Sequence, residues 1–201
     1  MAGPPLVLRG IRDPRVLEAM QAVPREEFVP GELRSLAYHD GPLPIGWGQT
    51  ISQPFVVAYM LQALRLRPRH RALEVGSGSG YAAAVLSRIV AEVFGVELEG
   101  ELHARSVETL ARLGCGNVHL RCGDGFLGWP EAAPFDAILL SCATGEMPPP
   151  LWDQLGEGGR LLYPRGPEHG EQELVLVTRR HGAPVERVLE PVRFVPLRRA
   201  P

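Results

Sequence analysis

Short apolar runs alternate with amphipathic stretches from residue 72 to the C-terminus. A short apolar run flanked by turn residues predicts a buried strand, and apolar positions three or four apart predict a helix. Strands that alternate with helices favour a mostly parallel, doubly wound α/β sheet, whose ligand crevice lies at the carboxyl ends of the central strands. The seven expected strands are 72–75, 92–96, 118–122, 135–141, 160–163, 174–178 and 188–195, and the expected helices are 81–90, 101–113 and 150–155.

Residues 1–71 are less regular and are punctuated by proline, which predicts an N-terminal helical and loop substructure packed on a core of residues 72–201. Asp13 followed by Pro14 is typical of a helix start, and we expect that helix to end near Val23. The apolar run 55–66 predicts a second, buried helix. Residues 42–54 hold too much glycine and proline for a regular element, so we expect a long ordered loop, where binding sites are often found.

The charge balance excludes two classes of partner. The chain of 201 residues has 21 basic and 23 acidic residues, and a net charge of −2 is too weak to hold nucleic acid or a membrane surface. Three cysteines without a CxxC spacing favour neither a disulfide framework nor a metal site. No secretory leader pattern is present and no apolar stretch approaches ~18 residues, so we expect a cytoplasmic protein, which we take to be a monomer.

Candidate chemistry begins at Gly76-Ser77-Gly78-Ser79-Gly80, between an expected strand and an expected helix. Such a turn lets backbone amides and a helix N-terminus approach a nucleotide-like ligand, although a tight strand-to-helix turn has the same composition. Glu74 precedes the turn and Glu97 ends the next strand, so both acids should point into the crevice, where Glu97 can accept both hydroxyls of a ribose. Asp124 and Gly125 end the third strand and could reach an adenine edge, or form a plain turn.

A dinucleotide is disfavoured, because the third glycine of that fingerprint is replaced by Tyr81 and the chain is too short for a separate substrate domain. The acid before the glycine turn, the ribose acid, the Asp on the third strand and the Gly158-Gly159 strand start resemble class I S-adenosylmethionine-dependent methyltransferases. The resemblance implies a Rossmann-like fold with S-adenosylmethionine as cofactor, S-adenosylhomocysteine as product and no metal.

Further segments extend the resemblance to one family, the protein-L-isoaspartate O-methyltransferases. The matching segments are 10–11, 23–30, 42–54, 73–81, 123–125, 133–138, 154–155, 158–160 and 193–197, and the most specific is Gly48-Gln49-Thr50-Ile51-Ser52-Gln53-Pro54. This similarity implies methylation of the free α-carboxylate of L-isoaspartyl residues in damaged peptides and proteins. It also implies that the last two strands are reversed relative to the usual order. The run Ser141-Cys142-Ala143-Thr144 departs from a more alanine-rich family sequence.

The family resemblance assigns roles to individual residues. Ser52 corresponds to the active-site serine, with Thr50 as the second catalytic hydroxyl. The implied cofactor contacts are Ile51, Glu74, Gly76, Ser77, Gly78, Gly80, Glu97, Leu98, Asp124 and Gly125, and the implied substrate contacts are Ile45, Gln49 and Val195. Without the family, the alternative for Ser52 is a hydroxyl that caps the helix that follows Pro54, and the two roles are compatible.

The residues of the loop agree with this chemistry. An α-carboxyl group has a pKa of about 3.3 to 3.7 and is ionised at neutral pH, so its methylation needs no general base, and the loop offers none. A carboxylate and a sulfonium lose their charges as they react, so a cation on the carboxylate would stabilise the ground state more than the transition state. Neutral hydroxyls on Thr50 and Ser52 can orient the oxygen without that penalty.

Two other interpretations stay open from the sequence. One is a methyltransferase for another peptide carboxylate, and the other is a non-catalytic module that binds a nucleoside or a damaged peptide. Independently of the function, the arginines of segment 65–71 and the terminal pair Arg198-Arg199 are expected to form solvated faces.

Overall fold

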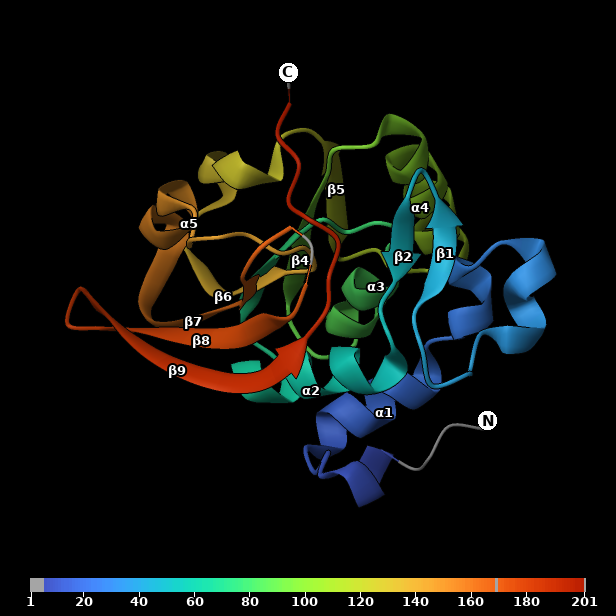
Figure 1. Cartoon of the computed structure of the whole chain (residues 1–201), viewed down its shortest axis with the longest axis horizontal. Coiled ribbons are helices and arrows are strands. Elements are labelled where there is room, and N and C mark those ends of the chain that lie inside the picture. The colour runs from blue at the N-terminus through green and yellow to red at the C-terminus, as the bar shows by residue number, and fades with distance from the viewer. Residues whose placement is uncertain (1–5, 169, 201) are drawn as a thin grey trace.

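The computed structural model describes residues 6–168 and 170–200. A seven-stranded sheet crosses the molecule in the order β5-β4-β3-β6-β7-β8-β9 (Figure 1), and its first five strands are parallel, whereas β8 and β9 are antiparallel to their neighbours. These strands are β3 (Arg71–Val75), β4 (Glu92–Glu97), β5 (Val118–Cys122), β6 (Phe135–Leu140), β7 (Leu155–Arg165), β8 (Gln172–Arg180) and β9 (Ala183–Val192). The predicted doubly wound, mostly parallel sheet is confirmed, including the reversed order of the last two strands.

Helices cover both faces of this sheet. The α-helices are α1 (Pro14–Ala22), α2 (Pro54–Leu64), α3 (Tyr81–Ser87), α4 (Gly100–Arg112) and α5 (Pro149–Gln154). Residues of α1 to α4 share one hydrophobic cluster with one face, and α5 packs in a second cluster against the other. Because successive strand residues point to opposite faces, Leu73 and Val75 enter the second cluster, while Ala72 and Glu74 face the layer of α2 and α3.

Sequence reasoning placed most of these elements within a few residues. The helix start at Pro14 is confirmed, with Asp13 as N-cap accepting a hydrogen bond from Arg15 N. Two strands of the core differ most: β7 begins at Leu155 instead of residue 160, because the chain pairs with Phe135 as soon as α5 ends, and β9 spans Ala183–Val192 instead of 188–195. None of the described helices has the length and apolar character needed to cross a bilayer.

The expectation of an irregular loop over residues 42–54 is wrong. The segment forms a hairpin of β1 (Leu43–Gly46) and β2 (Gln49–Ile51), in which Leu43 pairs with Ile51. The tight connection is possible because Gly46, Trp47 and Gly48 all have positive φ, a conformation that glycine adopts at little cost. Alternate burial of Leu43 and Ile45 fixes one face of the hairpin against the core.

The N-terminal part is joined to the sheet through shared apolar packing. Helix α1 contacts α2 and α3, and α2 contacts β7. The boundary near residue 71 stays a prediction. Arg71 itself belongs to β3, where its guanidinium group pairs with Glu92 at 2.9 Å, so the predicted solvated face does not extend to it.

Candidate active site

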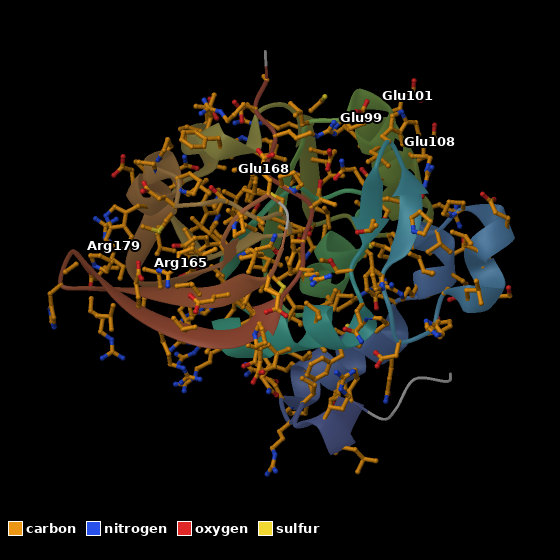
Figure 2. All side chains as sticks on the ribbon, in the orientation of Figure 1. Glu99, Glu101, Glu108, Arg165, Glu168 and Arg179 are labelled. Carbon is orange, nitrogen blue, oxygen red and sulfur yellow. The ribbon has the colours of Figure 1, made fainter. Side chains whose placement is uncertain are left out.

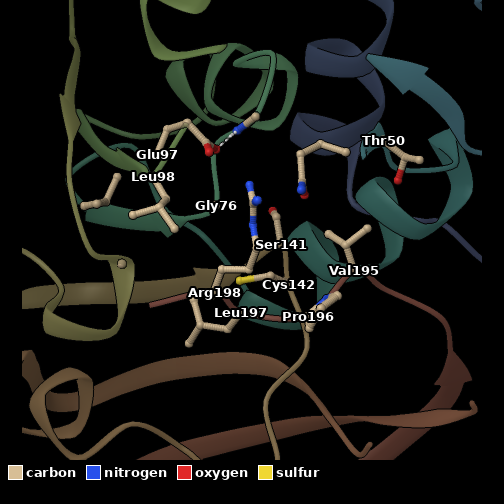
Figure 3. A pocket seen from close by; sticks show the side chains of 14 residues that line it. Thr50, Gly76, Glu97, Leu98, Ser141, Cys142, Val195, Pro196, Leu197 and Arg198 are labelled. Atoms are coloured by element: carbon tan, nitrogen blue, oxygen red, sulfur yellow. Dashed lines mark hydrogen bonds between the residues drawn. The ribbon is translucent and has the colours of Figure 1, made fainter. Parts of the chain in front are cut away.

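Three connected cavities open at the carboxyl ends of the parallel strands. We call them the crevice, the inner pocket and the outer groove. The crevice is lined by Gln49, Thr50, Gly76, Gly78, Val96, Glu97, Leu98, Gly125, Ser141, Cys142 and 195–198 (Figure 3). The inner pocket is lined by Thr50–Ser52, Val57, Met60, Glu74, Gly76–Ser79, Tyr81, Ala82, Leu139 and Ser141. The outer groove, of about 440 Å³, is lined by Pro42, Thr50, Ser52, Gln53, Val56, Ser141, Glu171 and 191–195.

The three cavities share part of their lining. Thr50 and Ser141 line all three of them, and Ser52 lines both the inner pocket and the outer groove. Ser52 follows β2, so the hairpin that replaces the expected loop carries both hydroxyls to the junction. The sequence-predicted catalytic pair therefore lies where a ligand in the inner pocket would meet a ligand in the outer groove.

The glycine turn forms the floor between crevice and inner pocket. Gly78 has φ of +53°, and a Cβ there would lie 3.2 Å from Cδ1 of Ile45. A side chain at this position would thus be strained and would push the hairpin away from the turn. Ile45, predicted to contact substrate, instead packs beneath this turn with 1% of its surface exposed.

Glu97 holds the turn in place from the end of β4. Its Oε2 accepts a hydrogen bond from Gly78 N at 2.7 Å, and its Oε1 accepts one from Glu99 N at 2.9 Å. The residue is buried but still lines the crevice. Since a carboxylate has about four acceptor sites, two remain available to the hydroxyls of a ribose.

Glu74 is a buried acid with an unusual partner set. Ser141 Oγ donates a hydrogen bond to its Oε1 at 2.8 Å, whereas Oε2 is buried and has no hydrogen-bond partner among the described residues. Burial raises the pKa of Glu74 to about 8, although the hydrogen bond from Ser141 opposes this shift. A buried, unpaired carboxylate oxygen at the inner pocket fits a ligand that brings positive charge.

The two predicted adenine contacts behave differently. Gly125 lines the crevice, but the carboxylate of Asp124 accepts hydrogen bonds from Phe126 N at 2.9 Å and from Arg199 Nε at 2.8 Å. The prediction that Arg198 and Arg199 form a solvated face is wrong in part. Arg199 also lies 3.8 Å from the ring of Phe126, and Arg198 lines the crevice, although both side chains stay about half exposed.

Other predicted residues are distributed around the three cavities. Leu98 lines the crevice, Ile51 and Ser77 line the inner pocket, and Val195 lies between crevice and outer groove. Gln49, predicted to contact substrate, lines the crevice instead of the outer groove. Gly80 is the N-cap residue of α3.

Sequence reasoning assigned no site role to four of the lining residues, Ser141, Cys142, Pro196 and Leu197. Ser141 and Cys142 follow β6, which pairs with β3 in parallel, so their position at this edge could have been predicted from the strand pattern. The C-terminal segment reaches the crevice through hydrogen bonds in which Ala143 N donates to Val195 O and Leu197 N donates to Ala143 O. These hydrogen bonds join segments that are distant in the sequence, so no local pattern predicts them.

This fold and site define an S-adenosylmethionine-dependent methyltransferase of the Rossmann-like class, and comparison with known proteins gives the family. The family model of protein-L-isoaspartate(D-aspartate) O-methyltransferase matches residues 6–200. A protein-L-isoaspartate O-methyltransferase 2 of Anaeromyxobacter sp. (strain Fw109-5) is 69% identical over 96% of this chain and 80% of its own length. The enzyme of Opitutus terrae is 54% identical over 96% of this chain and 83% of its own.

Solved structures agree with the family. A structure described as protein-L-isoaspartate O-methyltransferase has a TM-score of 0.88 at 32% identity, over 95% of this chain, and the chain spans 63% of that protein. A putative enzyme of this kind from Plasmodium falciparum, in complex with S-adenosyl-L-homocysteine, has a TM-score of 0.85 at 30% identity, over 97% of this chain and 95% of its own. The chain therefore belongs to the protein-L-isoaspartate O-methyltransferase family, which confirms the expected fold, cofactor and class of enzyme.

Proposed function

We propose that this protein transfers a methyl group from S-adenosylmethionine to the free α-carboxylate of L-isoaspartyl residues in peptides and proteins. The observation that carries the proposal is the position of Ser52 and Thr50 at the junction between the inner pocket and the outer groove. The resulting ester can close to a succinimide when a backbone nitrogen displaces methanol, and hydrolysis of the succinimide returns part of the chain to normal aspartate.

The residues around the crevice suit the proposed cofactor. Glu97, Leu98 and Gly125 would hold its nucleoside, and Glu74 with the amides of the glycine turn would hold its methionine end. When bound, this group supplies an electrophilic methyl on a positively charged sulfur. The buried side chains of Ile51, Glu74 and Tyr81 at the inner pocket would limit the access of water to the reacting atoms.

Ser52 and Thr50 orient the substrate oxygen without adding charge. The side chains that line the inner pocket include hydroxyls, one buried acid and apolar groups, and among the described residues none of them is a histidine or an arginine. This agrees with a reaction between an ionised carboxylate and a cationic donor, in which charge disappears as the transition state forms. The outer groove is large enough for a peptide segment that presents the carboxylate.

The decisive experiment compares two peptides that differ only in the linkage at one residue. Purified protein with labelled S-adenosylmethionine is expected to methylate the L-isoaspartyl peptide and not its normal aspartyl twin. A scintillation assay of peptide methyl ester measures both. Equal labelling of the two peptides would favour another peptide carboxylate as substrate, and labelling of neither would favour a non-catalytic binding module.

Replacement of Ser52 by alanine tests the proposed role of its hydroxyl. Loss of one oriented hydrogen bond to the carboxylate is expected to lower kcat by about tenfold and to leave the Kd for S-adenosylmethionine within about twofold. Steady-state kinetics and calorimetry measure the two effects. Ser35→Ala, in a short helix of residues Gly31–Leu36 away from the cavities, is the matched control. A large loss of cofactor affinity with unchanged kcat would assign Ser52 to binding instead.

A monomeric state, a cytoplasmic location and the individual residue roles remain part of this proposal. Family substrates are isoaspartyl-containing proteins, so the partners we propose are damaged polypeptides and not nucleic acids or membranes.

A further inference from the structure

A second large cavity lies against the same helix as the active site. We call it the basic cavity; it measures about 360 Å³ and lies between the C-terminal half of α2 and strands β7, β8 and β9. Its walls are Tyr59, Gln62, Ala63, Leu176, Thr178, Val185 and Leu189, together with the four arginines Arg65, Arg160, Arg180 and Arg187. A lining that combines apolar side chains with four arginines is suited to a ligand that has an apolar stem and an anionic end.

The four arginines concentrate positive charge at the basic cavity. They come from the end of α2 and from three different strands, and no ion pair among the described residues engages any of them. Burial, followed by the charges of Arg65, Arg180 and Arg67, lowers the pKa of Arg160. Like charges that converge without a counterion repel one another, and a bound anion would relieve this repulsion.

The basic cavity continues the line of the outer groove. Val56 and Val192 line the outer groove, whereas Ala63 and Arg187 line the basic cavity, so both cavities run between the same two elements. Figure 1 shows α2 lying next to the C-terminal end of β9. From Val192 to Arg187, strand β9 rises by about 17 Å, at about 3.3 Å per residue. An extended peptide beside β9 covers that length with about five residues.

We propose that a polypeptide substrate lies along α2 and β9 and places an acidic side chain in the basic cavity, about four to six residues from the isoaspartyl residue. The inference rests on the proposed function, because the outer groove must hold the reacting residue. Arginine binds carboxylates through two parallel hydrogen bonds, and the apolar side chains of the lining receive the methylene groups of a glutamate. The cavity thereby selects damage sites in acidic sequence surroundings.

Matched peptides test the selection directly. Each is about fifteen residues long and carries one isoaspartyl residue, with a Glu-Glu or Gln-Gln pair placed about five residues away on its N-terminal or C-terminal side. For one of the two sides, the Glu-Glu peptide is expected to have a kcat/KM about three- to tenfold higher than its Gln-Gln twin, mainly through KM. The difference should shrink at high salt.

Two double variants identify the cavity as the cause. Arg180→Gln with Arg187→Gln should abolish the preference and leave kcat/KM for the Gln-Gln peptides unchanged. Arg69→Gln with Arg88→Gln removes the same charge from positions outside the cavity lining and should keep the preference. Equal rates for all peptides with the unaltered protein would overturn the proposal, as would a preference that survives the first double variant.

Binding measurements separate this proposal from the proposed function. Fluorescence anisotropy of labelled Glu-Glu and Gln-Gln peptides, with S-adenosylhomocysteine present, reports occupancy of the cavity without any reaction. If neither peptide is methylated but the Glu-Glu peptide binds more tightly through the arginines, the proposed function is wrong. The proposal that the basic cavity binds an acidic side chain would then still hold. Tighter binding of a labelled DNA oligonucleotide through the same arginines would overturn the proposal in favour of nucleic acid.

Discussion

Replacing Glu97 by glutamine is expected to weaken S-adenosylmethionine binding by about 100-fold. The carboxylate already accepts hydrogen bonds from Gly78 N and Glu99 N, and its remaining acceptor sites face the crevice. A glutamine amide has one oxygen, so its NH₂ group must oppose either a backbone N–H or a ribose hydroxyl. A hydrogen bond to a charged group contributes about 1.5 to 3 kcal/mol, and the substitution removes at least one.

Calorimetric titration with S-adenosylmethionine measures the effect, and a thermal melt without cofactor separates it from loss of folding. Glu101→Gln is the matched control, since Glu101 is exposed on α4 and Figure 2 shows it at the outer side of that helix. The control should change the Kd by less than about twofold. If the Glu97 variant binds the cofactor as tightly as the unaltered protein, the ribose role is wrong and Glu97 only holds the turn.

The fold could be predicted because burial leaves a local trace in the sequence. Strands buried on both faces are continuous apolar runs, and the acids that end β4 and precede the glycine turn interrupt those runs visibly. The β1–β2 hairpin could not, because Pro44 and Gly46 alternate with buried Leu43 and Ile45 and suggest a loop by composition. Trp47 also has a positive φ, a conformation that glycine normally adopts in such turns, so the sequence did not indicate the turn at this position.

The rest of the site depends on contacts between segments that are distant in the sequence. Ser141 and Glu74 are 67 residues apart, and Arg199 and Asp124 are 75 apart. The sequence around one residue of such a pair therefore does not predict its hydrogen-bond partner. The arginines of the basic cavity show the same limit. Arg65 belongs to a run that was predicted to be a solvated face, and only the assembled sheet brings Arg160, Arg180 and Arg187 to it.

The free energy of unfolding is expected to fall by an amount on the order of 4 kcal/mol as pH rises, because of Glu74 alone. The folded pKa of Glu74 is raised by burial to about 8, from an ordinary value of 4.5. Below 4.5 the acid is neutral in both the folded and unfolded chain, so it carries no penalty. Between 4.5 and about 8 the unfolded chain has released this proton while the folded chain keeps it, so the free energy of unfolding falls progressively, and above about 8 it levels off.

Urea unfolding of the unaltered protein and of Glu74→Gln, without cofactor and from about pH 5 to about pH 9, measures this contribution. The two proteins should have similar stability at the acidic end, and the glutamine variant should be the more stable at the alkaline end. Glu108→Gln, an exposed acid on α4, is the control and should follow the unaltered protein at every pH. Parallel curves for all three proteins would show that Glu74 is ionised throughout.

The same group links stability to the cofactor. The ionisable groups that interact with Glu74 in the free protein are Glu97 and Cys142. Neither of them supplies a positive charge. A cofactor with positive ammonium and sulfonium groups would favour the ionised carboxylate, so its binding near neutral pH should release about one proton. Calorimetry in two buffers of different ionisation enthalpy counts that proton. If the unfolding curves show that Glu74 is neutral in the free protein, binding without proton release would mean that it stays neutral beside the methionine end and acts there as a hydrogen-bond donor.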